Sequence, residues 1–232
     1  MRRLRATLFL AGTGEAPALV AVTASEPGEG VSTLVTGLAG VLAPGSRVAV
    51  VEADLRDPVL ARRLGLDETA GLGEVLEGRA DLAEALTTWG DGVTVLPAGT
   101  ATRDPGDLLA TARVGEVLDR LRATHDVVLV DTPPLGSSVD AALLARRCDG
   151  AVVLCRAGAT AREEVAATVS ELTAVGARVI GGVLTMVPAR RRRRRSAARG
   201  ATGSVRTAVA APEEEPVGLP DEEAAPAGAH RA

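Results

Sequence analysis

The 232-residue sequence contains no lysine, tyrosine, asparagine or glutamine, and has only one phenylalanine and one tryptophan. All 26 of its basic side chains are therefore arginines. The two histidines, His125 and His230, are too few and too far apart in the chain to suggest a metal site. Cys148 and Cys155 form no CxxC pair and stand among apolar residues, so we expect core residues of a reducing, cytoplasmic compartment. No apolar run reaches the ~18 residues of a membrane span, and no signal peptide is expected.

The net charge of −4 conceals two regions of opposite sign. Residues 1–189 carry 17 arginines and 24 acidic residues, whereas residues 190–232 carry 9 arginines and 6 acidic residues. The larger region is acidic, and like charges repel a phosphate backbone, so its bulk charge disfavours binding to nucleic acid.

Short runs of Val, Leu and Ala alternate with helix-length segments over residues 1–189. Strands are predicted at 18–24, 46–53, 93–97, 126–131, 150–156 and 178–185, and helices at 32–42, 72–88, 106–123, 137–147 and 161–175. The strands are almost continuously apolar, as are parallel strands covered by helices on both faces. We therefore predict an α/β domain with a doubly wound, mostly parallel sheet that binds its ligand at the carboxyl ends of the strands.

The composition changes after Pro188. Six arginines, Arg190–Arg195, precede a stretch rich in Pro, Glu and Ala at 211–216. Residues 190–232 cannot bury enough apolar surface to offset the entropy of ordering, so we predict a disordered tail. Three uses of the arginines stay open: contact with an anionic membrane surface, contact with nucleic-acid phosphates, or no specific role.

A phosphate-binding loop is the most informative motif. Residues 24–33 read Ala-Ser-Glu-Pro-Gly-Glu-Gly-Val-Ser-Thr, between an apolar strand and a predicted helix. Such a setting points backbone N–H groups and a helix N-terminus at phosphate oxygens. Val31 stands where the motif has a lysine that binds the terminal phosphates. The predicted nucleotide-binding residues of this segment are Pro27, Gly28, Glu29, Gly30, Val31, Ser32 and Thr33.

Carboxylates follow two other predicted strands. Glu52 and Asp54 end the second strand, and Asp131 follows four apolar residues of the strand that begins at Asp126. Carboxylate and hydroxyl oxygens beside a phosphate loop suit Mg²⁺ and the positioning of water. We therefore predict Ser32, Asp54 and Asp131 as metal ligands, and Glu52, Asp54 and Asp131 as the catalytic set.

Taken together, these motifs resemble the bacterial tyrosine kinases of capsule and exopolysaccharide synthesis, which belong to the MinD/ParA-like P-loop group. The resemblance covers nearly all of residues 1–188. It is carried by the loop 24–33, by Glu-Ala-Asp-Leu-Arg-Asp-Pro at 52–58 and by Asp-Val-Val-Leu-Val-Asp-Thr-Pro-Pro at 126–134. It implies ATP or ADP with Mg²⁺ as ligands, and a membrane-anchored regulator of polysaccharide chain length as partner. Arg2 and Arg5 resemble the end of the family's oligomerisation motif, which implies a homo-oligomer.

The sequence departs from the family pattern at several functional positions. Val31 replaces the lysine, Glu52 replaces an aspartate, and Thr185 stands where relatives usually carry an asparagine that contacts the base. The family's C-terminal tyrosine cluster is absent, because the chain has no tyrosine. Arg56 is a candidate substitute cation.

Three functional hypotheses follow. The first is a weakly active or non-catalytic regulatory partner in polysaccharide assembly or export, cytoplasmic or peripheral at the inner face of the membrane. The second is an active ATP-dependent protein kinase or ATPase that tolerates Val31. The third, disfavoured by the Pro-rich loop and by weaker motif matches over residues 71–109, is a MinD/ParA-type partition ATPase.

Overall fold

The computed structural model describes residues 18–66 and 70–188. Three predictions made from the sequence lie outside these residues: the arginine run at 190–195, the disordered tail 190–232, and the oligomerisation motif at Arg2 and Arg5. Among the residues that the structure describes, no helix combines the length and the apolar character needed to cross a membrane.

The centre of the fold is a seven-stranded sheet with the order β3-β4-β2-β5-β1-β6-β7. Its strands pair in parallel except for the antiparallel pair β3 and β4. The predicted doubly wound, mostly parallel sheet is thereby confirmed. The strands are β1 (Leu19–Ala24), β2 (Val48–Glu52), β3 (Thr87–Trp89), β4 (Val93–Leu96), β5 (Val127–Asp131), β6 (Gly150–Arg156) and β7 (Val179–Thr185).

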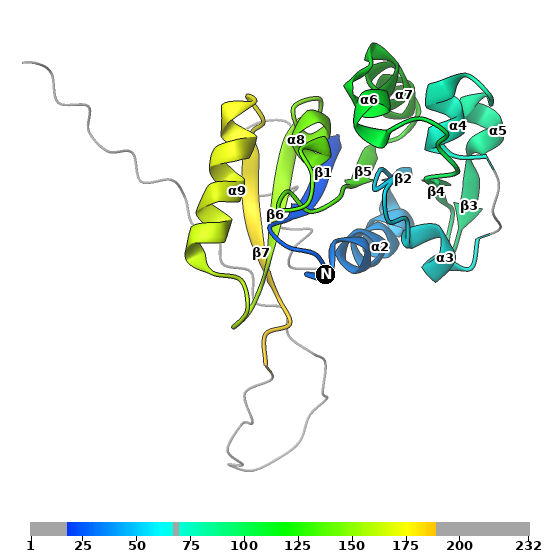
Figure 1. Ribbon diagram of the computed structural model, residues 1–232. Helices are drawn as coiled ribbons and strands as arrows, with labels where there is room; N and C mark the ends of the chain where they lie inside the picture. Colours follow the sequence, from blue (N-terminus) through cyan, green and yellow to red (C-terminus); the bar gives the residue numbers. More distant parts are fainter. Residues whose placement is uncertain (1–17, 67–69, 189–232) are drawn as a thin grey trace, which may run out of the picture.

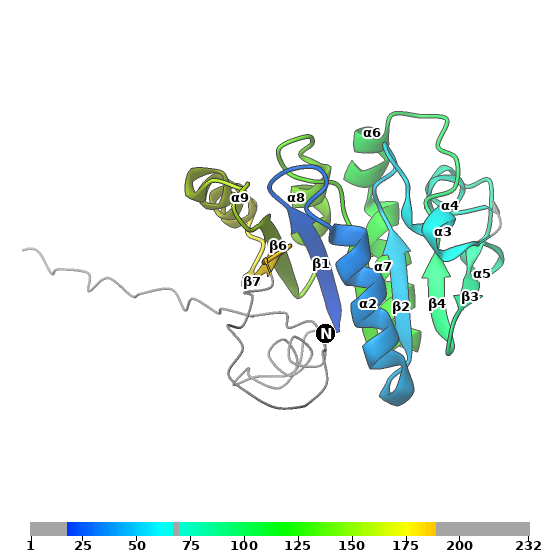
Figure 2. The same cartoon turned by 90° about the horizontal axis from the view of Figure 1, so that it is seen from below.

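Helices cover both faces of this sheet (Figure 1). One face carries α2 and α3, and the other carries α4 to α9. Figure 2 shows α2 running along the sheet between β1 and β2, where it packs over β5. The helices are α2 (Val31–Leu42), α3 (Leu60–Leu64), α4 (Leu72–Glu77), α5 (Leu82–Ala85), α6 (Pro105–Ala110), α7 (Ala112–Thr124), α8 (Asp140–Ala145) and α9 (Arg162–Ala174).

The apolar character of the strands follows from this sandwich. Along β1 every side chain is buried, with Val20 and Val22 in the core beneath α2 and Leu19 and Ala21 in the core on the other face. Successive residues of a strand point to opposite faces, so a strand covered on both sides must be apolar throughout.

The predicted helices 72–88 and 106–123 are each interrupted. Gly78 takes a left-handed conformation with φ of 75° and ends α4, and Thr87–Trp89 then pairs with β4 as a strand. β-branched and aromatic residues favour that pairing over a helix. Thr111 is extended and separates α6 from α7. The short helix α3 was not expected from the sequence.

The carboxyl ends of three neighbouring strands meet at one edge of the sheet. In the β2–β5 pair Glu52 lies opposite Asp131, and in the β1–β5 pair Val22 lies opposite the same aspartate. The loop after β1 and the segments after β2 and β5 therefore share one site.

Candidate nucleotide-binding site

The segment between β1 and α2 forms a tight turn that ends in a helix N-terminus. Gly28 and Gly30 have φ of 79° and 100°, in the left-handed region that side chains disfavour. Gly30 caps α2, and its carbonyl oxygen accepts a hydrogen bond from Leu34 N at 2.9 Å. The first amides of α2 consequently have no partner within the helix, which is the arrangement that binds phosphate.

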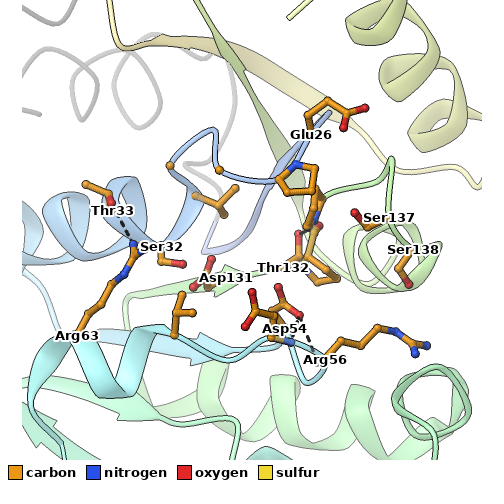
Figure 3. Close-up of a pocket in the computed structure, with 18 of the residues that line it drawn as sticks. Glu26, Ser32, Thr33, Asp54, Arg56, Arg63, Asp131, Thr132, Ser137 and Ser138 are labelled. Carbon is orange, nitrogen blue, oxygen red and sulfur yellow. Dashed lines mark hydrogen bonds between the residues drawn. The ribbon is translucent and has the colours of Figure 1, made fainter. Parts of the chain in front are cut away.

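This turn borders a pocket of about 420 Å³ (Figure 3). The other walls come from the residues after β2, from α3 and from the Asp-Thr-Pro-Pro segment after β5. The residues that were predicted from the sequence and line the pocket are Pro27, Gly28, Gly30, Val31, Ser32, Thr33, Asp54, Arg56 and Asp131. Sequence reasoning missed Arg63, Ser137, Ser138 and Met186, which also line it.

Asp131 ends β5 with only 2% of its surface exposed. Burial raises the pKa of this carboxyl to about 7, and a hydrogen bond from Ser32 acts in the opposite direction. Burial also raises the pKa of Asp54, whose carboxylate accepts hydrogen bonds from the backbone N of Arg56 at 3.2 Å and of Asp57 at 3.1 Å. Ser32, Asp54 and Asp131 together offer a hydroxyl and two carboxylates, the oxygen ligands that Mg²⁺ prefers.

Glu52 does not line the pocket, in contrast to its predicted catalytic role. Its buried carboxylate accepts hydrogen bonds from the backbone N atoms of Leu60 at 2.5 Å, Ala61 at 3.3 Å and Ala98 at 3.2 Å. The first two amides belong to the opening turn of α3. Glu52 therefore joins the end of β2 to α3 and to the segment after β4, which is a structural role.

This arrangement predicts the effect of shortening the side chain. In Glu52→Asp the carboxylate withdraws by one methylene, and buried amides lose their acceptor at a cost of about 1–3 kcal/mol. We expect chemical denaturation to report that loss of unfolding free energy. Glu52→Gln, which keeps the length and one carbonyl oxygen, is expected to lose less. Equal stability of all three proteins would contradict the assignment.

Glu29 and Thr185 lie behind the loop and not in the pocket. The buried carboxylate of Glu29 accepts hydrogen bonds from Ser25 N at 3.0 Å and Arg156 N at 3.3 Å, and also from the hydroxyl of Thr160. The hydroxyl of Thr185 donates to the backbone oxygen of Glu29 at 2.9 Å. These contacts brace the loop against β6 and β7, and neither residue lines the pocket. Their predicted contact with a nucleotide stays a prediction.

Arg56, the candidate substitute cation, forms ion pairs with two carboxylates. Its Nε donates to Asp140 at 2.9 Å, and its terminal nitrogens lie 3.3 and 3.4 Å from the oxygens of Asp104. Asp140 is buried, so releasing Arg56 towards a ligand would leave a buried carboxylate without its counter-ion.

The chain is similar to known bacterial kinases over most of its length. It is 32% identical over 178 residues to the tyrosine-protein kinase CpsD of Streptococcus agalactiae. The alignment covers 75% of this chain and 78% of that protein. The kinase domain of the Escherichia coli tyrosine kinase ETK superposes with a TM-score of 0.76 at 26% identity, covering 86% of this chain and 78% of the other.

A more distant structure has the same fold. The cobyrinic acid a,c-diamide synthase of Mycobacterium smegmatis, with bound ADP and magnesium, gives a TM-score of 0.64 at 23% identity over 74% of this chain and 75% of that one. No model of a protein family matches the sequence.

Proposed function

Because this chain belongs to the family of bacterial tyrosine-protein kinases, we propose that it binds ATP or ADP with Mg²⁺ in the pocket beside α2 and transfers phosphate slowly or not at all. It then acts as a regulatory partner in capsule or exopolysaccharide assembly or export. The alternative is an active protein kinase of the same family.

The observation that carries the proposal is the place of Val31. This residue lines the pocket as the first residue of α2, and its half-buried side chain packs against the core beneath that helix. It therefore brings no charge to the loop where a lysine would meet the β- and γ-phosphates. One missing preorganised donor costs ~10²–10³ in rate, and a cation on a transferring phosphoryl group is worth ~10³–10⁵.

The chain has the groups that would bind the nucleotide, as distinct from the lysine that would accelerate phosphate transfer. The amides at the start of α2 are available to phosphate oxygens. Ser32, Asp54 and Asp131 would hold Mg²⁺, which when bound would neutralise charge on the phosphates. Nucleotide binding without rapid turnover is the combination that these residues favour.

The partner and the place of action extend the same proposal. A kinase-like protein of polysaccharide export would work with a membrane-anchored regulator of chain length at the inner face of the membrane. Arg190–Arg195 would contribute ~1 kcal/mol per arginine to binding an anionic lipid surface.

Two measurements on the 232-residue chain test the function. Calorimetry is expected to detect binding of ATP and ADP that is lost when Mg²⁺ is chelated. Incubation with labelled ATP and a tyrosine-containing acceptor protein is expected to give no phosphotyrosine above that formed without the chain. Phosphotyrosine on the acceptor would favour the active kinase instead.

A further inference from the structure

The pocket has an excess of negative charge that a nucleotide would have to overcome. Four carboxylates line it, from Glu26, Asp54, Asp57 and Asp131, against the two arginines Arg56 and Arg63. A polyphosphate entering this pocket needs cationic partners in addition to Mg²⁺. Arg56 is bound to Asp140 and Asp104, so its charge is already compensated.

Arg63 is the remaining cation on the pocket wall. Its Nη1 lies 3.4 Å from the hydroxyl oxygen of Thr33, in the first turn of α2, and Figure 3 shows its side chain extending from α3 towards Ser32 and Thr33. Among the described residues it takes part in no ion pair. It is exposed, so its guanidinium can meet a ligand without first leaving a carboxylate.

The position of Arg63 is fixed by the helix that carries it. The backbone N of Arg63 donates to Val59 O at 3.1 Å, and Glu52 accepts from the first amides of α3. The contacts of Glu52 thus hold α3 against the end of β2, with Arg63 facing the phosphate loop. A charged side chain on an anchored helix is better placed for a ligand than one on a free loop.

We propose that Arg63 is the phosphate-binding cation of this pocket. It supplies the binding part of the role of the lysine that Val31 replaces, without acting on the phosphate during transfer. Its N–H groups would donate to phosphate oxygens of bound ATP or ADP beside the Ser32–Thr33 end of the loop. A guanidinium suits this role because its planar set of donors matches phosphate oxygens in pairs. The inference rests on the proposed function, since it assumes that a nucleotide binds here.

Calorimetry with Mg²⁺ and ATP or ADP on the 232-residue chain tests this role. Hydrogen bonds to charged groups contribute ~1.5–3 kcal/mol, so Arg63→Gln is expected to weaken binding ~10–100-fold. Arg62→Gln is the matched control: it removes the same charge from the same helix at an exposed residue outside the pocket, and is expected to change the Kd less than twofold. Adding Val31→Lys to Arg63→Gln is expected to restore most of the lost affinity.

Each contrary result has a distinct meaning. If the wild type binds ATP and Arg63→Gln binds it equally well, Arg63 is not the phosphate cation, while the proposed function stands. If Arg62→Gln loses as much as Arg63→Gln, the effect is one of net charge and the assignment is wrong. If the wild type binds no nucleotide, both proposals fail. Unchanged melting temperatures of the variants exclude unfolding as the cause.

Discussion

Replacing Val31 with lysine is expected to raise ATP turnover by ~10²–10³-fold over the wild type. The side chain at this position leaves the first residue of α2, directly after Gly30, and lines the pocket. From there a lysine can reach back over the loop to the β- and γ-phosphates. A charge that acts on the transferring group lowers the barrier to transfer, whereas Arg63 is assigned to the bound nucleotide.

Steady-state hydrolysis of ATP, measured together with the melting temperature, checks this expectation. Val31→Met is the matched control, because it lengthens the side chain without adding charge and is expected to leave turnover unchanged. The half-buried valine also packs on the core, so the lysine is expected to lower the melting temperature by a few degrees. A folded Val31→Lys protein without a gain in turnover would show that the site lacks more than one cation.

Because Glu52 stands where the family pattern has an aspartate, Glu52→Asp is an obvious companion substitution for Val31→Lys. The structure argues against that change, because the carboxylate of Glu52 is engaged by Leu60, Ala61 and Ala98 and not by the pocket. A Glu52→Asp substitution would loosen α3 and with it the position of Arg63. The single substitution at Val31 is therefore the cleaner test of catalytic repair.

The fold was predictable because its strands are buried on both faces. Continuous apolar runs such as Val127–Val130 indicate parallel strands that are buried on both faces. The alternation of such strands with helices indicates a central sheet between two layers of helices. The predicted helix boundaries were wrong where a single residue ends a helix. An example is Gly78, whose left-handed conformation ends α4. α3 was missed because five residues are too few to show a helical period.

The site was predictable to the extent that it is local in sequence. The loop, Asp54 and Asp131 are each recognisable from a short motif at the end of a strand. Glu29 and Glu52 were predicted as site residues because they too belong to such short motifs. In the structure their carboxylates accept hydrogen bonds from backbone amides that the fold brings near. Arg63 was missed because its relation to Thr33 spans 30 residues and exists only once α3 is packed.

Substituting Asp131 with asparagine is expected to stabilise the metal-free protein at pH 8. Burial raises the pKa of Asp131 to about 7 in the folded state, from an ordinary value near 3.8. Between about pH 4 and pH 7 the unfolded chain loses this proton while the folded chain retains it, so the contribution of Asp131 to stability falls as the pH rises. Above pH 7 the buried carboxylate destabilises the fold by about 4 kcal/mol at most. Asparagine has the same shape and no charge.

The same substitution is expected to act in the opposite direction on function. Without the carboxylate, Mg²⁺-dependent affinity for ATP should fall at least ~10-fold, because a neutral amide is a weaker ligand for a hard cation.

Denaturation with a chelator present, at pH 5, 6.5 and 8, is expected to show a stability advantage of Asp131→Asn that widens with pH. Asp54→Asn, at a less buried carboxyl, should show a smaller advantage. An advantage that does not change with pH would contradict the raised pKa. A stabilised variant that binds Mg²⁺ and ATP normally would instead remove Asp131 from the metal site. A carboxylate that binds a ligand but destabilises the fold has both effects when it is replaced. The variant gains stability and loses binding.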